Sequence, residues 1–257
     1  MSFIDSRRWI SLLLKILPKI DEISIEELNS SEIKMLTMLH FTFWQKPVKL
    51  CGFGSVIDSL RMLKSNEPLF LEILELLKIR FNSIDLVDEE INLGFECPLD
   101  LYCNYSRDQI LSAFDYYTDD SMPNMREGVL YLADKNTDIL FVTLNKTEKD
   151  YSPTTMYNDY SISEFLFHWQ SQSTTSETSP TGQRYINHKK LGSRVLLFVR
   201  EFKEEKIGST AIAQPYTFLG LAEYVSHKGS RPMNIIWRLE KPIPAKYLKK
   251  TSKLIVG

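Results

Sequence analysis

The sequence is poor in cysteine and has no long apolar run, and each shortage excludes a class of protein. No uninterrupted apolar run among the 257 residues reaches about 18, the length that a membrane span requires. The apolar stretch 3–20 is interrupted by charged side chains and lacks a small-residue cleavage site, so we expect an amphipathic helix and not a secretory signal. Three cysteines, Cys51, Cys97 and Cys103, cannot close a set of disulfides, which fits a reducing compartment. We therefore expect a cytoplasmic protein without membrane contact.

Common catalytic and metal-binding motifs are also missing. No G-x-x-x-x-G-K-[ST], G-x-S-x-G, H-E-x-x-H or paired C-x-x-C occurs. The four histidines have no metal-ligand spacing among themselves or with the cysteines. The segment REFKEEK offers Glu201-x-Lys203, which is half of a restriction-type nuclease signature, but no partner acid is obvious upstream. We predict no catalytic residue, cofactor or metal, and keep a Mg²⁺-dependent nuclease that uses Glu201 and Lys203 as an alternative.

The charge is distributed unevenly along the chain. Residues 180–257 hold 15 basic and 5 acidic side chains, a net charge of +10, whereas residues 98–179 hold 5 basic and 13 acidic ones. Such a basic segment is typical of a face that binds a polyanion. The alternative is that these cations keep the surface soluble and neutralise the acidic middle of the chain.

Residues 1–97 have the pattern of a helical region. Ser24 and Glu27 have the spacing of a capping box, and the apolar residues that follow recur at close to 3.6 positions, which predicts a helix. Another helix is predicted over residues 66–81, with Asn66 as its N-cap. Its predicted buried stripe is Phe70, Leu71, Leu74, Leu77 and Phe81. Gly94 and Pro98 then break the helical pattern, so residues 1–97 are predicted to form a helical connector or coupling region.

Residues 98–257 have mainly the pattern of strands. A helix capped by Ser106 and Gln109 comes first, and a hairpin is predicted at 128–145 with DKNT as its turn. Further strands are predicted at 164–171, 193–202, 216–227 and 233–240, with short helices near 182–190 and 244–250. We therefore predict an α+β protein: an N-terminal helical region, then a mixed, mainly antiparallel curled β-barrel with flanking helices.

Aromatic, acidic and amide side chains gather in the segment TTMYNDYSISEFLFHWQSQSTTS. A cytosine extruded from a duplex needs flat rings for stacking and an acceptor for its N4 amino group. The predicted modified-base pocket is Tyr157, Asp159, Tyr160, Phe167, His168, Trp169, Gln170, Ser171 and Gln172. The structural alternatives are that one face of the strand, including Phe167, is core and that Asp159 caps a turn or helix.

Cations and hydroxyl groups follow on predicted loops and on a short helix. Helix N-termini, basic side chains and hydroxyls commonly contact phosphates. The predicted DNA-backbone contacts are Thr174, Gln183, Arg184, Tyr185, His188, Lys189, Lys190, Ser226, His227, Lys228 and Arg231. Residues 176–180 are expected to be a flexible tip that orders over DNA, although each charged loop could instead simply be solvated.

Long segments within residues 98–245 also resemble a known family. These segments are REGVLYL, DILFVTLNKTEKDYSPTTMYNDYSIS, FHWQSQSTTS, SPTGQRYINH, VLLFVRE and PYTFLGLAEYVSHKGSRPMNIIWRL. Together they are similar to the C-terminal domain of SauUSI-type modification-dependent (Type IV) restriction endonucleases, where it follows a phospholipase-D-type nuclease and a superfamily 2 ATPase. Residues 1–97 resemble the connector that precedes that domain.

The resemblance implies a target-recognition region that reads 5-methylcytosine or 5-hydroxymethylcytosine in duplex DNA. It implies an SRA-like fold that flips the modified base, and partners in the ATPase and nuclease domains of a parent enzyme, which this chain lacks. The chain itself is then not an enzyme. The rival from another class is a protein-interaction or RNA-binding module, in which the apolar helices of residues 1–97 form a partner or homodimer interface.

Overall fold

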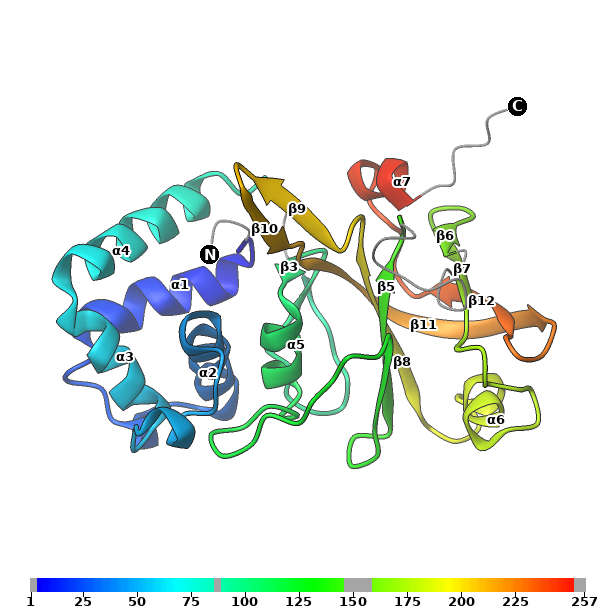
Figure 1. Cartoon of the computed structure of the whole chain (residues 1–257), viewed down its shortest axis with the longest axis horizontal. Coiled ribbons are helices and arrows are strands. Elements are labelled where there is room, and N and C mark those ends of the chain that lie inside the picture. Colours follow the sequence, from blue (N-terminus) through cyan, green and yellow to red (C-terminus); the bar gives the residue numbers. More distant parts are fainter. Residues whose placement is uncertain (1–3, 86–88, 146–158, 252–257) are drawn as a thin grey trace. The chain divides into compact units, whose positions relative to one another are not determined.

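The computed structural model describes residues 4–85, 89–145 and 159–251 (Figure 1). Packing divides the chain into two units, residues 1–125 and 126–257, and each packs mainly within itself. The domain boundary expected from the sequence lies between residues 97 and 98, and it stays a prediction. No helix among the described residues is long and apolar enough to cross a membrane.

The first unit is helical, as the sequence predicts. Its helices are α1 (Arg7–Ile16), α2 (Ser30–Trp44), α3 (Val56–Ser65), α4 (Glu67–Asn82) and α5 (Arg107–Ala113), with 3₁₀ turns η1 (Leu17–Lys19), η2 (Ile25–Glu27) and η3 (Lys49–Cys51). Short strands are β1 (Glu89–Glu90), β2 (Asp100–Leu101) and β3 (Asn104–Tyr105), and β1 pairs with β2. Helix α2 packs against α5 and α3, while α1 packs against α4.

The start of α2 differs from the prediction. Glu27 lies in η2, which has no side-chain cap, and α2 begins one residue after Asn29. Asn29 Oδ1 accepts a hydrogen bond from the Glu32 backbone N–H at 2.9 Å, and Glu32 Oε2 accepts one from the Asn29 N–H at 3.0 Å. Asn is as good an N-cap as Ser, so the pattern alone did not separate the two capping boxes. The predicted N-caps of α4 and α5 are confirmed.

The buried stripe of α4 is narrower than predicted. Phe70, Ile73 and Leu77 are buried, whereas Leu71 is 56% exposed and Ile79 is 57% exposed. The segment carries more apolar residues than the core-facing side of one helix can hold. The excess leaves apolar side chains on the outside of the first unit.

His40 on α2 lies fully buried in the core of the first unit. Its Nδ1 is 2.9 Å from Ser59 Oγ, its Nε2 is 2.8 Å from the Lys46 carbonyl oxygen, and its ring stacks on Trp44. A carbonyl oxygen can only accept, so Nε2 carries a proton. Burial lowers the pKa of His40, which favours the neutral ring.

The second unit is built on a sheet with the strand order β4–β5–β8–β11–β12–β7–β6. The strands are β4 (Val129–Leu132), β5 (Thr137–Thr143), β6 (Tyr160–Ser161), β7 (Leu166–Gln170), β8 (Arg194–Arg200), β11 (Tyr216–Lys228) and β12 (Asn234–Leu239). A separate hairpin consists of β9 (Glu204–Ile207) and β10 (Thr210–Ala213), and the helices are α6 (Pro180–Asn187) and α7 (Ala245–Thr251). The strands and short helices predicted for this region are therefore confirmed.

The sheet is mainly antiparallel but is not closed into a barrel. Neighbouring strands are antiparallel except β5 and β8, which are parallel. Among the described residues, β4 and β6 stand at opposite ends of the strand order and do not pair with each other. The predicted barrel is therefore wrong, while the predicted α+β class is confirmed.

Strand β11 is bent, so that it serves two partners. Its first part pairs with β8 and its last part pairs with β12, as Figure 1 shows. The register shifts between Phe218 and Gly220, where Gly220 has a φ of 91°, and again between Tyr224 and Ser226. Such β-bulges bend a strand and increase its twist. The bend turns residues 222–228 into part of a second half-sheet with β12, β7 and β6.

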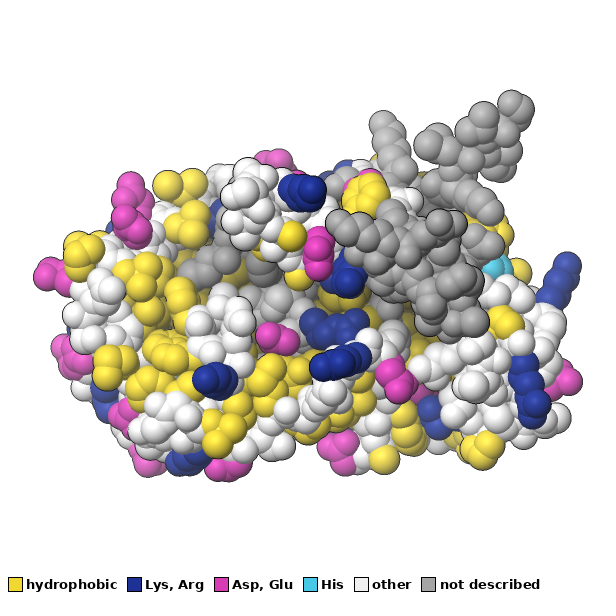
Figure 2. All heavy atoms as spheres, in the orientation of Figure 1, with side chains coloured by type: hydrophobic (Ala, Val, Ile, Leu, Met, Phe, Trp, Pro, Cys, Tyr) yellow, Lys and Arg dark blue, Asp and Glu magenta, His cyan; other side chains and the backbone are white. Residues whose placement is uncertain are grey.

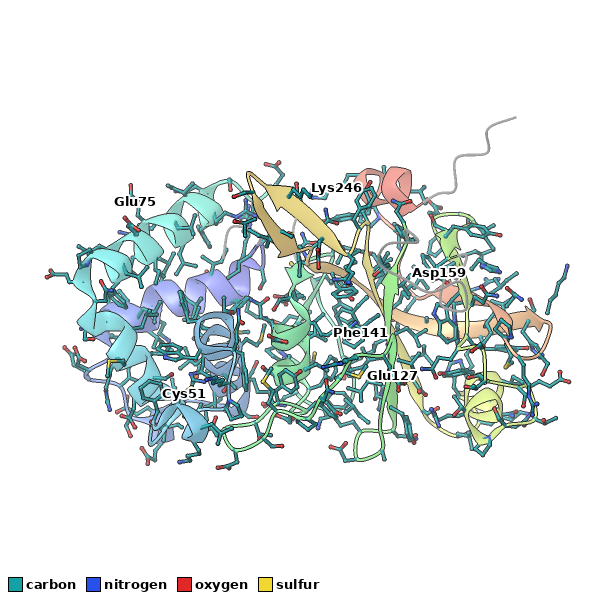
Figure 3. All side chains as sticks on the ribbon, in the orientation of Figure 1. Cys51, Glu75, Glu127, Phe141, Asp159 and Lys246 are labelled. Atoms are coloured by element: carbon teal, nitrogen blue, oxygen red, sulfur yellow. The ribbon has the colours of Figure 1, made fainter. Side chains whose placement is uncertain are left out.

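The half of the sheet around β8 is held by a ladder of aromatic rings. Phe198 stacks on Phe218 of β11 with ring centroids 4.4 Å apart, and on Phe141 of β5 at 5.9 Å. Figure 3 labels Phe141 in this ladder. All residues of β5 are buried, which explains why its central residues, 139–142, form a continuous apolar run in the sequence.

Candidate nucleic-acid interface

Strands β6, β7 and β12 and the last part of β11 form a half-sheet whose register assigns each side chain to a face. Directly paired residues of antiparallel strands lie on the same face, and neighbours along a strand alternate. Trp237 pairs with Phe167 on one side and with Tyr224 on the other, so these rings share a face. We call this the inner face, made of Phe167, Trp169, Tyr224, Ile235 and Trp237.

The inner face is core. Tyr185 of α6 packs edge-on against Trp169 at 5.5 Å and against Trp237 at 6.1 Å between ring centroids. Phe167, Trp169 and Tyr185 are all buried. These three rings pack within the protein core. The predictions that Phe167 and Trp169 line the base pocket and that Tyr185 contacts the DNA backbone are therefore corrected. The alternative that one face of β7 is core holds for Phe167 and Trp169.

His188 is buried beside the inner face. Its Nδ1 lies 3.3 Å from the Ser193 carbonyl oxygen, and its Nε2 accepts a hydrogen bond from the Tyr224 backbone N–H at 3.0 Å. These partners require a proton on Nδ1 and none on Nε2, which is the neutral ring. Burial lowers the pKa of His188 and favours the same state. The predicted phosphate contact is therefore corrected: His188 joins α6 to β11.

Arg184 is also committed within the protein. Its Nε and Nη2 donate to the two carboxylate oxygens of Asp138 at 2.7 and 2.8 Å, and its guanidinium lies 3.7 Å from the Tyr131 ring centroid. The Asp138 side chain is 0% exposed and that of Arg184 is 18% exposed. A paired buried guanidinium cannot turn to a phosphate without leaving the carboxylate unpaired. For this reason Arg184 is removed from the predicted DNA-backbone contacts.

The opposite side of the half-sheet has a different composition. We call it the outer face, made of Tyr160, Leu166, His168, Gln170, Glu223, Ser226, Lys228, Asn234, Ile236 and Arg238. Its cross-strand rows are Lys228–Asn234–Gln170, Ser226–Ile236–His168–Tyr160 and Glu223–Arg238–Leu166. Every one of these side chains is half-buried or exposed. The outer face thus joins rings, amides and cations from four strands.

Tyr160 and His168 form the aromatic part of the outer face. Their rings stack with centroids 4.8 Å apart and planes at 16°. Gln170 lies in the adjacent row, and Lys228 stands at the end of that row. Figure 2 shows Lys and Arg side chains on the surface of the second unit. Three predicted pocket residues and the predicted backbone contacts Ser226 and Lys228 therefore lie on one face.

Asp159 stands immediately before β6 and is labelled in Figure 3. Its Oδ1 accepts a hydrogen bond from the Gln170 backbone N–H at 2.9 Å, and the residue is 7% exposed. This carboxylate connects the start of β6 to the end of β7. The hydrogen bond to Gln170 therefore supports the alternative that Asp159 has a structural role. Tyr157 lies outside the described residues, and its place in the pocket stays a prediction.

The Ser/Thr-rich segment after β7 is an ordered loop. The backbone N–H of Ser171 donates to the Met233 carbonyl at 2.9 Å, and Ser171 Oγ accepts from the Met233 N–H at 2.9 Å. The Arg231 N–H donates to the Thr175 carbonyl at 3.1 Å, and Ser176 is buried. These bonds hold the loop against the turn between β11 and β12. The expected flexible tip is corrected at Ser176, and Ser171 has a structural role.

Several residues that were predicted to contact DNA form hydrogen bonds within the protein instead. Gln172 Nε2 donates to Glu127 Oε2 at 2.7 Å, and Gln183 Nε2 donates to the Glu177 carbonyl at 2.7 Å. His227 lies between Tyr224 and Glu177, with its Nδ1 2.6 Å from Tyr224 Oη and its Nε2 3.2 Å from Glu177 Oε2. Exposed predicted contacts are Thr174, Lys189, Lys190, Ser226, Lys228 and Arg231. Lys189 forms a surface ion pair with Glu223 at 2.7 Å.

Sequence reasoning missed the contribution of β12 to the outer face. Asn234, Ile236 and Arg238 alternate with buried Ile235, Trp237 and Leu239. This alternation was visible in NIIWRL, but the segment was interpreted only as a strand. The pairing of β12 with β7, far earlier in the sequence, is what gives these residues their neighbours.

The nuclease alternative finds no supporting geometry in the described part of the chain. Glu201 follows β8 and Lys203 precedes β9. Residues 4–85, 89–145 and 159–251 contain no group of three or more His, Cys, Asp or Glu side chains that could hold a metal ion. A Glu201/Lys203 nuclease therefore stays a prediction.

Comparison with known families gives a match over the second half of the chain. Residues 99–250 match a family described as a domain of unknown function, DUF3427. A search of curated proteins finds no match.

Proposed function

The chain belongs to the DUF3427 family, and we propose that it is a DNA-recognition module that reads a modified cytosine. The base is 5-methylcytosine or 5-hydroxymethylcytosine, flipped out of the duplex as in SRA domains. Binding licenses cleavage by a superfamily 2 ATPase and a phospholipase-D-type nuclease. The resemblance to SauUSI-type Type IV restriction enzymes supports these partners.

One observation supports the proposal: segments that are distant in sequence bring aromatic, amide and cationic side chains to one face. Tyr160 and His168 present stacked rings, Gln170 presents an amide, and Lys228 presents an exposed cation on the outer face. Aromatic rings stack on bases of any sequence, and cations contact phosphates. Packing of the hydrophobic core does not require a cation or amides at these positions.

The energetics favour a flipped base on such a face. Extrusion costs a few kcal/mol of lost stacking and pairing. Stacking on an aromatic side chain returns about 1–3 kcal/mol per base, and hydrogen bonds to the base edge add to this. The extra methyl group contributes about 0.8 kcal/mol if it is buried, so a preference of roughly fourfold for the methylated base is expected from burial alone.

Fluorescence anisotropy with matched duplexes tests the function. Three duplexes carry cytosine, 5-methylcytosine or 5-hydroxymethylcytosine at the same position, and the full chain is titrated at one fixed salt concentration. We expect tighter binding to at least one modified duplex. Equal affinity for all three would contradict the reading function, and no DNA-dependent change even at low salt would contradict DNA binding.

A protein-docking function is the second candidate, and α4 provides its support. Leu71 and Ile79 are large apolar side chains that are more than half exposed. Apolar groups exposed on one element are common where a protein partner binds. In a recognition module this surface contacts the parent enzyme; in the rival function it contacts a separate partner or a second copy of the chain.

A further inference from the structure

A pocket opens at the end of the outer face where β7 begins and β12 ends. It has a volume of about 540 Å³. Its lining residues are Ser163, Phe165, Leu166, Glu223, Arg238, Leu239 and Glu240. The row Glu223–Arg238–Leu166 belongs to the outer face, so the pocket lies next to the row that contains Tyr160 and His168.

The wall of the pocket is fixed by backbone hydrogen bonds. Ser163 Oγ accepts from the Leu166 N–H at 3.1 Å, and the Phe165 carbonyl accepts from the Leu239 N–H at 2.8 Å. The Glu240 N–H donates to the Leu221 carbonyl at 3.0 Å. These bonds hold the segment before β7 against the end of β12, so the backbone of the wall is positioned in advance of any ligand.

A carboxylate and a guanidinium stand side by side in this pocket. Glu223 and Arg238 are directly paired across β11 and β12, which places their Cβ atoms about 5 Å apart on one face. Arg238 is exposed, and within the described residues its guanidinium forms no ion pair. Glu223 contacts Lys189 through Oε2 only, which leaves Oε1 as an acceptor. The pocket therefore offers acceptors beside a row of donors.

This arrangement complements the Watson–Crick edge of cytosine. That edge presents one donor, the N4 amino group, followed by two acceptors, N3 and O2. A carboxylate accepts from N4, and the planar fork of an arginine donates to N3 and O2. Thymine presents an acceptor where cytosine has its amino group, so the carboxylate repels it. The Phe165 ring, 38% exposed, is available to stack, and Leu166 offers apolar contact to a 5-methyl group.

We infer that this pocket receives the flipped base, with Glu223 accepting from the N4 amino group and Arg238 donating to N3 and O2. The inference rests on the proposed function and names its base-reading residues. It replaces Asp159 as the amino-group acceptor, because Asp159 is only 7% exposed and is not among the residues that line the pocket. Phe165, which the predicted pocket did not contain, becomes a stacking residue.

A comparison of 5-methylcytosine with thymine separates reading of the base edge from reading of the methyl group. Both bases carry the methyl group, and thymine opposite guanine is also easily flipped. We expect the wild-type chain to bind the 5-methylcytosine duplex about tenfold or more tightly than the thymine–guanine duplex, because a bidentate contact discriminates by roughly this factor. Arg238→Met, Arg238→Lys and Glu223→Gln are each expected to reduce this ratio toward one.

Matched variants control for charge and for the ion pair of Glu223. Lys228→Ala is expected to weaken binding to both duplexes equally, so the ratio of the two affinities is unchanged. Lys189→Ala removes the ion pair but leaves the Glu223 carboxylate as an acceptor, so the ratio is again expected to be unchanged. Circular dichroism and thermal unfolding check that each variant is folded.

The outcomes distinguish the two claims. The wild type could prefer 5-methylcytosine over cytosine while the folded Arg238 and Glu223 variants keep the wild-type ratio of 5-methylcytosine to thymine affinity. This result would overturn the assignment of the pocket but leave the proposed function standing. Absence of any wild-type preference for modified cytosine would overturn both.

Discussion

Replacing Arg184 with methionine is expected to destabilise the second unit by about 3 kcal/mol. The change removes two charge-assisted hydrogen bonds, of 2.7 and 2.8 Å, from Asp138 and leaves that carboxylate at 0% exposure without a counter-charge. Breaking a buried pair on one side costs about 3–5 kcal/mol, and the lower end applies because the Arg184 side chain is still 18% exposed. Methionine keeps most of the packing volume, so the electrostatic loss dominates.

Urea and thermal unfolding measure this loss, and roughly 10 °C in Tm is expected for a unit of this size. Asp138→Asn and the double variant complete a thermodynamic cycle, in which the double variant is expected to recover part of the stability because no charge is left buried alone. The reasoning is refuted if Arg184→Met unfolds within about 0.5 kcal/mol of the wild type and binds DNA much more weakly. That result would restore Arg184 as a DNA-backbone contact, as predicted from the sequence.

Two further predictions concern DNA affinity and pH. Lys228→Ala is expected to weaken binding to every duplex alike and to lower the slope of log K against log salt by about one, and anisotropy across salt concentrations measures it; a loss confined to the modified duplex would contradict this role. Burial lowers the pKa of His40 below its ordinary value of 6.5. As pH falls, the His40 ring is therefore protonated in the unfolded chain before it is protonated in the folded chain. The resulting stability is present above pH 6.5 and is lost as pH falls toward the lowered pKa. Urea unfolding at several pH values tests it, and a His40→Gln variant with the same pH dependence would contradict it.

Local signals predicted the elements well. The β4–β5 hairpin, the cap of α5 at Ser106 and the strand at 216–227 depend on residues close in sequence. The β9–β10 hairpin was missed because EEKI is charged and both strands lie outside the apolar core, so no alternating pattern marks them. The α2 cap was misplaced because two capping boxes compete within residues 24–32.

The arrangement of the strands depends on contacts that sequence patterns do not encode. Parallel pairing of β5 with β8 and the bend of β11 decide that the sheet stays open. Other long-range contacts give Arg184 its partner Asp138 and give His188 its partner Tyr224, so two predicted phosphate contacts are engaged within the protein. The sequence shows that Arg184 is basic, but only the folded structure shows that Asp138 is its acidic partner.

Photo-cross-linking is the most direct test of the outer face as the site of base reading. A duplex with 5-iodocytosine in place of 5-methylcytosine puts a reactive atom where the methyl group lies, and mass spectrometry of the irradiated full chain maps the attachment. We predict attachment within residues 160–170, at Phe165 or at the stacked rings of Tyr160 and His168. Attachment confined to residues 1–125, or none in a complex shown to form, would contradict the account.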